Sequence, residues 1–368
     1  MKKNICFFSV GFAFNRLVRL KYYEKIFPKD TNIFLYTTNK YEGKEKQNYQ
    51  YQWTGLKRTK IVTEEYNLIK TVYNFRMFCK KNNIDRVYNL GFHNSWPILY
   101  FACISTGNKR DYCLNVLTDI FNQYHLVESK NESLKELLTL LYLWPGIFLS
   151  KKTFFTDRRD AIRAPRFFLS GQNKMKWLAA PVNTDVFTIK DKSVIRRKLK
   201  ISPDKRIVIF VGRINYLKCS DILKKIIESN PELYFILVGR LIDESMTRIK
   251  SKNYMIINFL NSDDLVDYYN ASDFSFCLNR GGGGIGLSSE EALACGLPIV
   301  VCKEFKLEES KSLYQVQIDF DGANKAVKDY FNLPIKEREI LSKLAREYVK
   351  VHYSDDVWKE EYIKSYLE

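Results

Sequence analysis

Short hydrophobic runs recur along this chain and are separated by stretches with helical spacing. Positions 207–211 hold five consecutive apolar residues, and comparable runs occupy 234–238 and 274–278. Runs of this length between turn residues are typical of strands buried on both faces of a sheet. Between the runs, apolar residues recur every three or four positions, as in helices that bury one side. The pattern predicts α/β architecture, with parallel sheets and helices on both faces.

The same alternation is weaker in the first half of the chain. There the apolar runs predict strands at 4–10, 33–37, 87–90, 113–117 and 153–156. The segments with helical spacing between them predict helices at 67–81 and 96–105. The chain has 368 residues, of which 46% are hydrophobic, and this is enough for two substantial cores. We therefore expect two domains, residues 1–185 and 186–350, and a final helix within 351–368.

Residues 133–149 form the most hydrophobic segment and contain Pro145, which we expect to interrupt a helix. We favour a buried core helix over a segment in a membrane interface. No run of eighteen apolar residues occurs, so no transmembrane helix is expected. The first residues indicate a strand and not a signal peptide. Eight cysteines without a Cys-x-x-Cys pair suit reduced thiols, and three histidines make a zinc site improbable, so we expect a cytoplasmic protein without a metal site.

The net charge of +17 is concentrated in one half of the chain. Residues 1–187 contain 30 Lys and Arg against 15 Asp and Glu. Such asymmetry indicates an anionic partner, either a membrane surface, a phosphate-bearing acceptor or nucleic acid, although a solvated lysine-rich surface is the simpler alternative. A run of four arginines at 158–166 ends in two phenylalanines at 167–168, but no nucleic-acid-binding motif accompanies them, so nucleic acid is the least favoured partner.

A cluster of glycines lies between a predicted strand and a predicted helix. Four glycines at 281–284 precede Ile285 and Gly286, and residues 287–295 have helical spacing that Gly296 can end. A glycine loop that leads into a helix offers backbone N–H groups to an anion or to sugar hydroxyls. A glycine-rich turn without a ligand would give the same local pattern.

This stretch resembles the donor-site signature of the glycosyltransferase family 4 group, whose members have two Rossmann-like domains in the GT-B architecture. The signature runs Glu-Gly-Phe-Gly-Leu, three variable residues, then Glu-Ala-x-Ala-x-Gly-x-Pro. Its second part matches from Glu291 to Pro298. The resemblance implies that Glu291 holds the nucleotide ribose and that the loop contacts the donor through backbone amides, at Gly284, Ile285, Gly286 and Leu287. It also implies that the last helix crosses back to the first domain.

A second motif follows the predicted strand at 207–211. It reads Gly212, Arg213, four further residues, then Lys218. Two cations five residues apart after a strand suit a pyrophosphate, because Arg holds two oxygens at once and Lys acts as a point charge. In the resembled family, the equivalent arginine and lysine bind the donor diphosphate. Two ordinary surface cations are the alternative. The family has a glycine after the lysine, where this chain has Cys219.

The resemblance implies further donor contacts at the ends of other predicted strands, namely Gly11, Arg16, Arg240, Phe259 and Leu260. Many family members carry a histidine near the sugar, at the tip of the strand predicted at 113–117. Thr118 stands in that place here, and Asp119 is the nearest ionisable group. Asp119 is therefore a catalytic candidate beside Arg213 and Lys218, although a structural polar residue is the simpler interpretation.

The sequence departs from the family at Gly283, where the signature has its first glutamate. Arg280 is one group that could fill the gap, by binding a donor that carries a carboxylate. The alternatives are a pseudoenzyme or partner subunit that binds a nucleotide sugar, or another nucleotide-sugar reaction. We favour a metal-independent glycosyltransferase without a cofactor, using a UDP-linked donor and a glycan or polyprenyl-linked acceptor in polysaccharide or glycoconjugate synthesis. It would act in the cytoplasm, peripherally at the inner face of the cell membrane.

Overall fold

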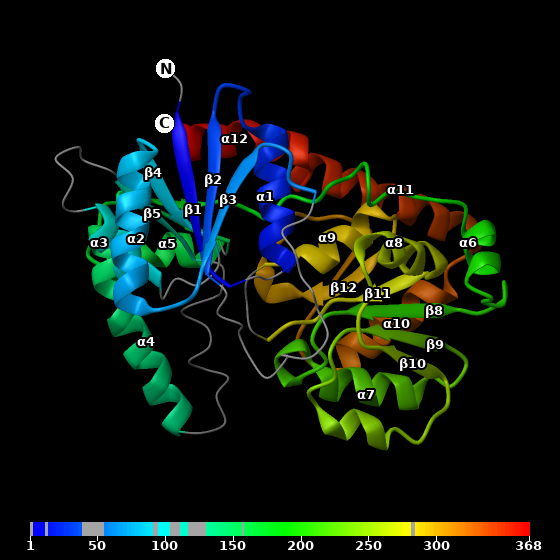
Figure 1. Cartoon of the computed structure of the whole chain (residues 1–368). Helices are drawn as coiled ribbons and strands as arrows, with labels where there is room; N and C mark the ends of the chain where they lie inside the picture. Colours follow the sequence, from blue (N-terminus) through cyan, green and yellow to red (C-terminus); the bar gives the residue numbers. More distant parts are fainter. Residues whose placement is uncertain are drawn as a thin grey trace. The chain divides into compact units, whose positions relative to one another are not determined.

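The computed structural model describes residues 3–11, 14–38, 55–90, 95–103, 111–116, 130–156, 158–280 and 284–368. The chain divides into two compact units, which are shown in Figure 1. The first unit comprises Met1–Ala179 and Lys359–Glu368, and the second comprises Ala180–Trp358. The divisions thus fall after Ala179 and Trp358, whereas the sequence suggested boundaries after residues 185 and 350.

The first unit contains a parallel sheet in the order β3-β2-β1-β4-β5-β6-β7. Its strands are β1 (Asn4–Val10), β2 (Asn32–Thr38), β3 (Thr59–Glu64), β4 (Arg86–Asn89), β5 (Asp111–Val116), β6 (Lys152–Phe155) and β7 (Met175–Trp177). Its helices are α1 (Phe14–Ile26), α2 (Leu68–Lys81), α3 (Trp96–Cys103), α4 (Lys130–Leu149), α5 (Arg158–Phe167) and the 3₁₀ turn η3 (Gln172–Lys174), joined by the end of α12 (Asp355–Leu367).

Along each strand of the first sheet, successive side chains point to opposite faces of the sheet. Cys6 and Phe8 of β1 lie in the core formed with α2 to α5, whereas the ring of Phe7 stacks on Tyr23 of α1, with ring centroids 4.8 Å apart. Tyr366 of α12 packs on the same face as Tyr23, at a centroid distance of 5.1 Å. The last turns of the chain therefore complete the first core, because they cover apolar strand residues that α1 leaves open.

The helix α4 differs from the sequence expectation. Pro145 does not interrupt it, since the helix continues from Lys130 to Leu149. Leu143 and Ile147 are buried, whereas Leu141 and Phe148 are exposed. The segment is thus a core helix on one side and presents an apolar side to solvent. In the described part of the chain, no helix is both long and apolar enough to cross a membrane.

The second unit contains a parallel sheet in the order β10-β9-β8-β11-β12-β13. Its strands are β8 (Ile207–Val211), β9 (Tyr234–Val238), β10 (Tyr254–Ile257), β11 (Phe274–Phe276), β12 (Ile299–Cys302) and β13 (Leu313–Val316). Its helices are α6 (Lys192–Lys198), α7 (Ser220–Ser229), α8 (Ser262–Ala271), α9 (Leu287–Ala294), α10 (Phe320–Asn332) and α11 (Ile335–His352), with the 3₁₀ turns η4 (Tyr216–Lys218), η5 (Glu244–Arg248) and η6 (Lys303–Phe305).

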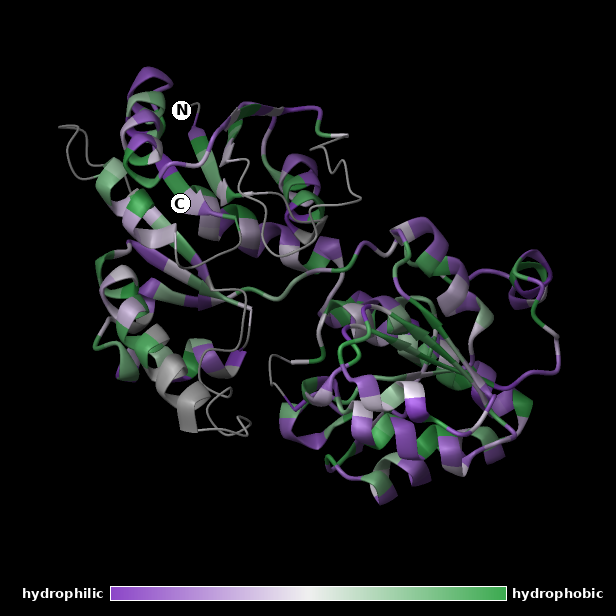
Figure 2. Cartoon of the chain, turned by 60° about the horizontal axis from the view of Figure 1, so that its bottom comes forward, coloured by the Kyte–Doolittle hydropathy of each residue, from purple (hydrophilic) through white to green (hydrophobic). Residues whose placement is uncertain are grey.

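Both faces of the second sheet are covered, so its strands are hydrophobic throughout, as Figure 2 shows. Helices α7 and α10 pack on one face, and α8, α9 and α11 pack on the other. The two chain segments that border this unit run side by side: Val182 and Ser354 form a parallel bridge, and the Val182 N–H donates to the carbonyl of Tyr353 at 2.9 Å. The two parallel-sheet α/β units confirm the predicted fold class.

Candidate donor-binding site

The candidate site lies at the carboxyl edge of the second sheet. The strand order runs outward in both directions from β8 and β11, which are neighbours. In open parallel sheets, the loops after two such strands leave toward opposite faces, and ligands bind in the crevice between them. Here these loops are residues 212–219, after β8, and residues 277–286, after β11. The N–H of Arg280 donates to the carbonyl of Leu217 at 2.8 Å, so the two loops are joined directly.

Two glycines fix the start of the first loop. Gly212 has φ +149° and Gly239, at the end of β9, has φ +139°. A Cβ atom on Gly239 would lie 2.0 Å from the carbonyl oxygen of Gly212. The backbones of the two strand ends therefore approach each other more closely than any side chain would allow. This close approach determines the position of the backbone at Arg213, which directly follows Gly212.

The turn after Arg213 places Lys218 at the start of α7. The side chain of Asn215 caps η4 by accepting the N–H of Lys218 at 3.1 Å. Cys219 then takes the left-handed conformation, with φ +55° and ψ +39°, and α7 begins at Ser220. This conformation explains why a glycine is usual after the lysine in the resembled family, since glycine adopts positive φ without strain.

Cys219 gives a prediction about stability. Its thiol is buried, and the pKa of that thiol is raised to about 12, chiefly by burial. Replacing Cys219 by Ala or by Gly removes the sulfur in both cases, but only Gly relieves the left-handed backbone. We expect Cys219→Gly to be more stable than Cys219→Ala by about 1 kcal/mol in urea unfolding. An Ala variant that is the more stable of the two would show that the backbone here carries no strain.

Arg213 and Lys218 form a pair of cations. Burial lowers the pKa of Lys218, and the nearby positive charge of Arg213 lowers it further. Within the described residues, neither side chain forms a salt bridge with a carboxylate. Two adjacent cations without acidic partners repel each other, and a bound polyanion would remove that cost. The structure thus brings the two predicted phosphate ligands together.

Arg280 is placed differently from the prediction that it binds a donor carboxylate. Its Nη1 and Nη2 atoms hold both oxygens of Asp221 at 2.6 and 2.9 Å, and Nη1 also donates to the carbonyl of Tyr216 at 2.8 Å. The guanidinium also lies over the ring of Tyr216, 4.1 Å from its centroid. A forked guanidinium satisfied by a carboxylate in its own protein is not available for one in a ligand. Arg280 instead fastens the glycine loop to the start of α7.

The described part of the glycine loop leads into α9 as predicted. Gly284 and Gly286 have φ of +74° and +77°, and added Cβ atoms would meet nothing within 4 Å. Both glycines are thus required by backbone conformation while the space beside them is open. Ile285 is buried, and the first N–H groups of α9, at Leu287 and Ser288, donate to no acceptor in the described residues. These N–H groups can bind a donor.

Glu291 lies in the first turns of α9 and is half-buried. The Tyr269 hydroxyl donates to its Oε2 at 3.3 Å and to the carbonyl of Ser288 at 2.9 Å. Burial raises the pKa of Glu291 to about 8 despite that hydrogen bond. Its neighbour Glu290 is buried, its Oε2 has no hydrogen-bond partner in the described residues, and burial and the charge of Glu291 raise its pKa as well. An acid that is neutral in the empty site can donate to a ligand as well as accept from it.

The remaining predicted donor residues of the second unit follow neighbouring strands. Arg240 comes after β9 and is exposed, whereas Phe259 and Leu260 come after β10, with Phe259 46% exposed. Because parallel strands end at the same edge, these residues share the edge of β8. Their predicted donor contacts stay predictions.

In the first unit, Gly11 ends β1 with φ +79°, as a turn there requires. Arg16 was predicted to face a ligand, but it is buried and its Nη1 donates to Ser9 Oγ and to the carbonyls of Val10 and Gly11, at 2.9 to 3.0 Å. These contacts occupy Nη1 within the first unit, and the predicted donor contact of Arg16 stays a prediction. Asp119 and Gly283 lie outside the described residues.

Four residues of this region were not identified from the sequence: Asn215, Asp221, Tyr269 and Glu290. Asn215 carries a local signal, because Asn at the start of a short helical turn is a typical cap. Asp221 and Tyr269 act through contacts between segments that are separate in the sequence, and the role of Glu290 depends on its burial in the fold. Among the described residues, no group of His, Cys, Asp or Glu side chains could hold a metal ion.

Comparison with known proteins gives a match within the second unit. The family model described as "Glycosyl transferases group 1" matches residues 191–347, which lie within the second unit. A D-inositol 3-phosphate glycosyltransferase of Mycolicibacterium gilvum is 30% identical over 130 residues, covering 32% of this chain and 29% of that protein. The enzyme of the same name from Actinosynnema mirum is 31% identical over 146 residues, covering 34% and 35%. The chain therefore matches only about a third of the length of these relatives.

Solved structures extend the likeness to the whole chain. Sucrose-phosphate synthase from Thermosynechococcus elongatus has a TM-score of 0.79 at 15% identity, covering 99% of this chain and 98% of that one. Anabaena HepE, solved with UDP and glucose, has a TM-score of 0.76 at 12% identity, covering 99% of both chains. Identities this low establish the fold alone. Residues 191–347 of the second unit therefore match the group 1 glycosyltransferase model, and the chain as a whole has the two-domain GT-B fold.

Proposed function

We propose that this protein transfers a sugar from a nucleotide diphosphate donor to a glycan or lipid-linked acceptor, without a metal. The observation that carries the proposal is the pair Arg213 and Lys218, two adjacent cations without an acidic partner among the described residues. Breaking the glycosidic bond of such a donor leaves a diphosphate, and two positioned cations stabilise the negative charge that develops on it. Asp119, the other catalytic candidate, would act on the acceptor side.

The other groups at this edge of the sheet suit the rest of the donor. Glu291 would hold the ribose hydroxyls, the N–H groups at the start of α9 would meet the phosphates or the sugar, and Phe259 and Leu260 would border the base. A uridine base is favoured because the neighbour HepE was solved with UDP and with UDP-glucose. The relatives that match the second unit are named for an inositol phosphate acceptor, so a phosphorylated acceptor is one further candidate.

The donor assignment can be tested by calorimetric titration of UDP, GDP and ADP. We expect UDP to bind with the highest affinity of the three. Arg213→Ala should weaken UDP binding by about 10- to 100-fold, because it removes charge-assisted hydrogen bonds to the diphosphate. Arg248, an exposed arginine of η5 in the same unit, supplies the matched control, and Arg248→Ala should leave affinity unchanged. Binding that survives Arg213→Ala would remove the basis of the proposal.

A membrane surface is the proposed setting of the acceptor. The charge excess of residues 1–187 would attract an anionic bilayer, each basic residue near it contributing about 1 kcal/mol at low salt. The apolar side of α4, which exposes Leu138, Leu141 and Phe148, could enter the interface. Flotation with anionic vesicles should then be salt-sensitive, and equal binding to neutral vesicles in high salt would argue against this setting.

A second candidate is a protein that binds a nucleotide sugar without transferring it. The observation in its favour is Gly283, where the resembled family has a glutamate near the donor sugar. Turnover can be screened by mass spectrometry with a panel of nucleotide sugars and a membrane extract. If Gly283→Glu raises activity on a neutral hexose donor, Gly283 determines donor choice. If both forms bind UDP and neither turns over any donor, the binding function replaces the transferase.

A further inference from the structure

A second isolated cation lies in the first unit. Arg19 of α1 is half-buried, and its guanidinium donates to the hydroxyl of Tyr23. Nearby tyrosine hydroxyls raise the pKa of Arg19 against the effect of burial, so its charge is firmly held. Among the described residues, no carboxylate forms an ion pair with it. A half-buried charge without a counter-ion is costly unless an anion reaches it.

The hydrogen bonds around Arg19 run in one direction. The Tyr366 hydroxyl donates to Asn115 Oδ1 at 2.5 Å, so the Tyr23 hydroxyl, 3.0 Å from that of Tyr366, is the donor between them. Asn115 in turn pairs with Asn89, donating from Nδ2 to its carbonyl at 2.6 Å. Both tyrosine hydroxyl protons of this network are used, and each member is neutral except Arg19. These hydrogen bonds orient the guanidinium but contribute no negative charge that would balance it.

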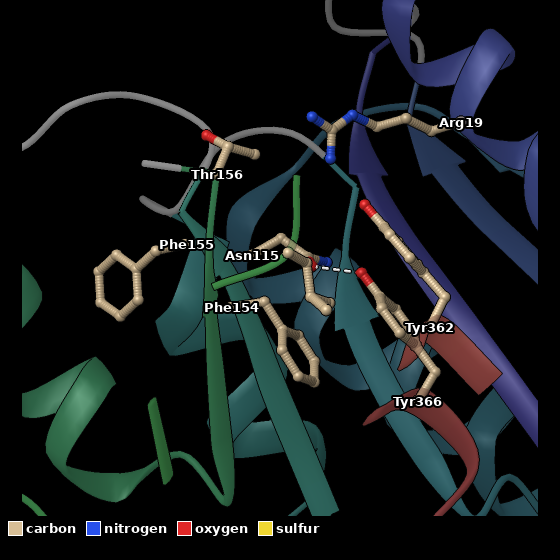
Figure 3. A pocket seen from close by; sticks show the side chains of 8 residues that line it. Arg19, Asn115, Phe154, Phe155, Thr156, Tyr362 and Tyr366 are labelled. Carbon is tan, nitrogen blue, oxygen red and sulfur yellow. Dashed lines mark hydrogen bonds between the residues drawn. The ribbon is translucent and has the colours of Figure 1, made fainter. Parts of the chain in front are cut away.

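An opening lies beside the guanidinium. Figure 3 shows Arg19 on one side of it, Thr156 on the other, and aromatic rings that include Phe154 and Tyr362 below. It encloses about 170 Å³ of unfilled space, including space open to solvent. Its enclosed part has room for about one water molecule, so a larger group would bind at the mouth. Thr156 directly follows β6, and the opening therefore lies at the carboxyl edge of the first sheet, where α/β folds bind ligands.

We propose that Arg19 and Thr156 form an oxyanion-binding subsite on the first unit, which takes the phosphate or carboxylate group of the acceptor. The guanidinium has free donor positions toward the opening, and a forked donor matches two oxygens of one anionic group. The Thr156 hydroxyl, which has no hydrogen-bond partner among the described residues, supplies a third donor. The role as an acceptor subsite rests on the proposed transferase function, whereas anion binding itself does not.

Inorganic phosphate is the direct probe, titrated by calorimetry at constant ionic strength. UDP is added first to saturation, so that Arg213 and Lys218 are occupied. We expect Arg19→Gln to weaken the remaining phosphate binding at least about tenfold, and Thr156→Val to weaken it about threefold. Arg166→Gln removes an exposed arginine of the same unit and should change nothing. Unchanged phosphate binding in both Arg19→Gln and Thr156→Val overturns the inference.

The two proposals fail separately in this design. If UDP does not bind, the donor assignment fails, and the phosphate titration is repeated in an Arg213→Ala, Lys218→Ala background to read the Arg19 subsite alone. Acetate in place of phosphate distinguishes a carboxylate group from a phosphate group. Should Arg19→Gln unfold, Arg19→Lys replaces it, because lysine keeps the charge and loses the forked pair of donors. The phosphate affinity of Arg19→Lys should be lower than that of the wild type. It should be higher than that of the double variant Arg19→Lys Thr156→Val. Equal affinity in all three forms would contradict the subsite.

Discussion

Gly239→Ala is expected to destabilise the second unit by about 3 kcal/mol or more and to weaken UDP binding at least about tenfold. The new Cβ would lie 2.0 Å from the carbonyl oxygen of Gly212, and the backbone at φ +139° would be strained as well. Neither strand end can move without breaking sheet hydrogen bonds, since Gly239 N–H donates to Ile257 and Gly212 N–H to Val238. The displacement would therefore reach Arg213.

Two other glycine-to-alanine variants separate the causes. Gly284→Ala introduces strain at φ +74° but no overlap, and should cost about 1 kcal/mol of stability. Gly171→Ala has neither a positive φ nor a neighbour within 4 Å, and should change stability by less than about 0.5 kcal/mol. Urea unfolding measures all three. If Gly239→Ala is no less stable than Gly284→Ala, the close approach of the two strands does not hold the loop of residues 212–219 in place.

Glu291→Gln is expected to stabilise the empty protein increasingly as pH rises. The pKa of Glu291 is about 8 in the folded protein and near 4.5 when unfolded. Below pH 4.5 both states hold the proton, and the wild type suffers no penalty. Between pH 4.5 and 8 the unfolded state loses its proton first, so the stability of the wild type falls. Glutamine keeps the neutral form at every pH, and its advantage should reach about 2–5 kcal/mol by pH 9.

Unfolding in urea at pH 5, 7 and 9 measures this difference. Glu304→Gln, which changes an exposed glutamate of the same unit, should show no pH-dependent advantage. Glu291→Gln should also lose affinity for UDP, since glutamine cannot become the carboxylate that ribose hydroxyls prefer. An advantage that is constant with pH would show that Glu291 is ionised in the empty site. Glu290 contributes to the size of the effect, because its own raised pKa depends on the charge of Glu291.

Much of the fold follows from local sequence patterns. The strands of the second sheet are short apolar runs because helices cover both faces, and their limits agree with the sequence to within two residues at β8, β9 and β11. Asn67 caps α2 where the pattern places the helix start, its Oδ1 accepting the N–H of Lys70 at 3.1 Å. Gly286 and Gly296 border α9 with positive φ. Signals of this kind operate within a few residues, so the sequence contains them completely.

The sequence also identified the cation pair, because Arg213 and Lys218 belong to one turn after one strand. It did not identify the partners that orient the site. Arg280 looked available for a ligand, but the structure places Asp221 against it, and Nη1 of Arg16 donates to the end of β1. A basic side chain in a sequence shows its charge but not the groups that satisfy it.

The tertiary structure alone decided which charges are satisfied within the fold and which are left for a ligand. Tyr366 reaches Tyr23 and Asn115 across 343 and 251 residues of chain, and Tyr269 reaches Glu291 across 22. Burial in these contacts also sets the protonation of Glu291, which no local pattern encodes. The sequence by itself determined the strands of the second sheet, the limits of α9 and the turn that carries Arg213 and Lys218, because these depend on neighbouring residues. Solvation and charge pairing depend on segments that meet only after folding.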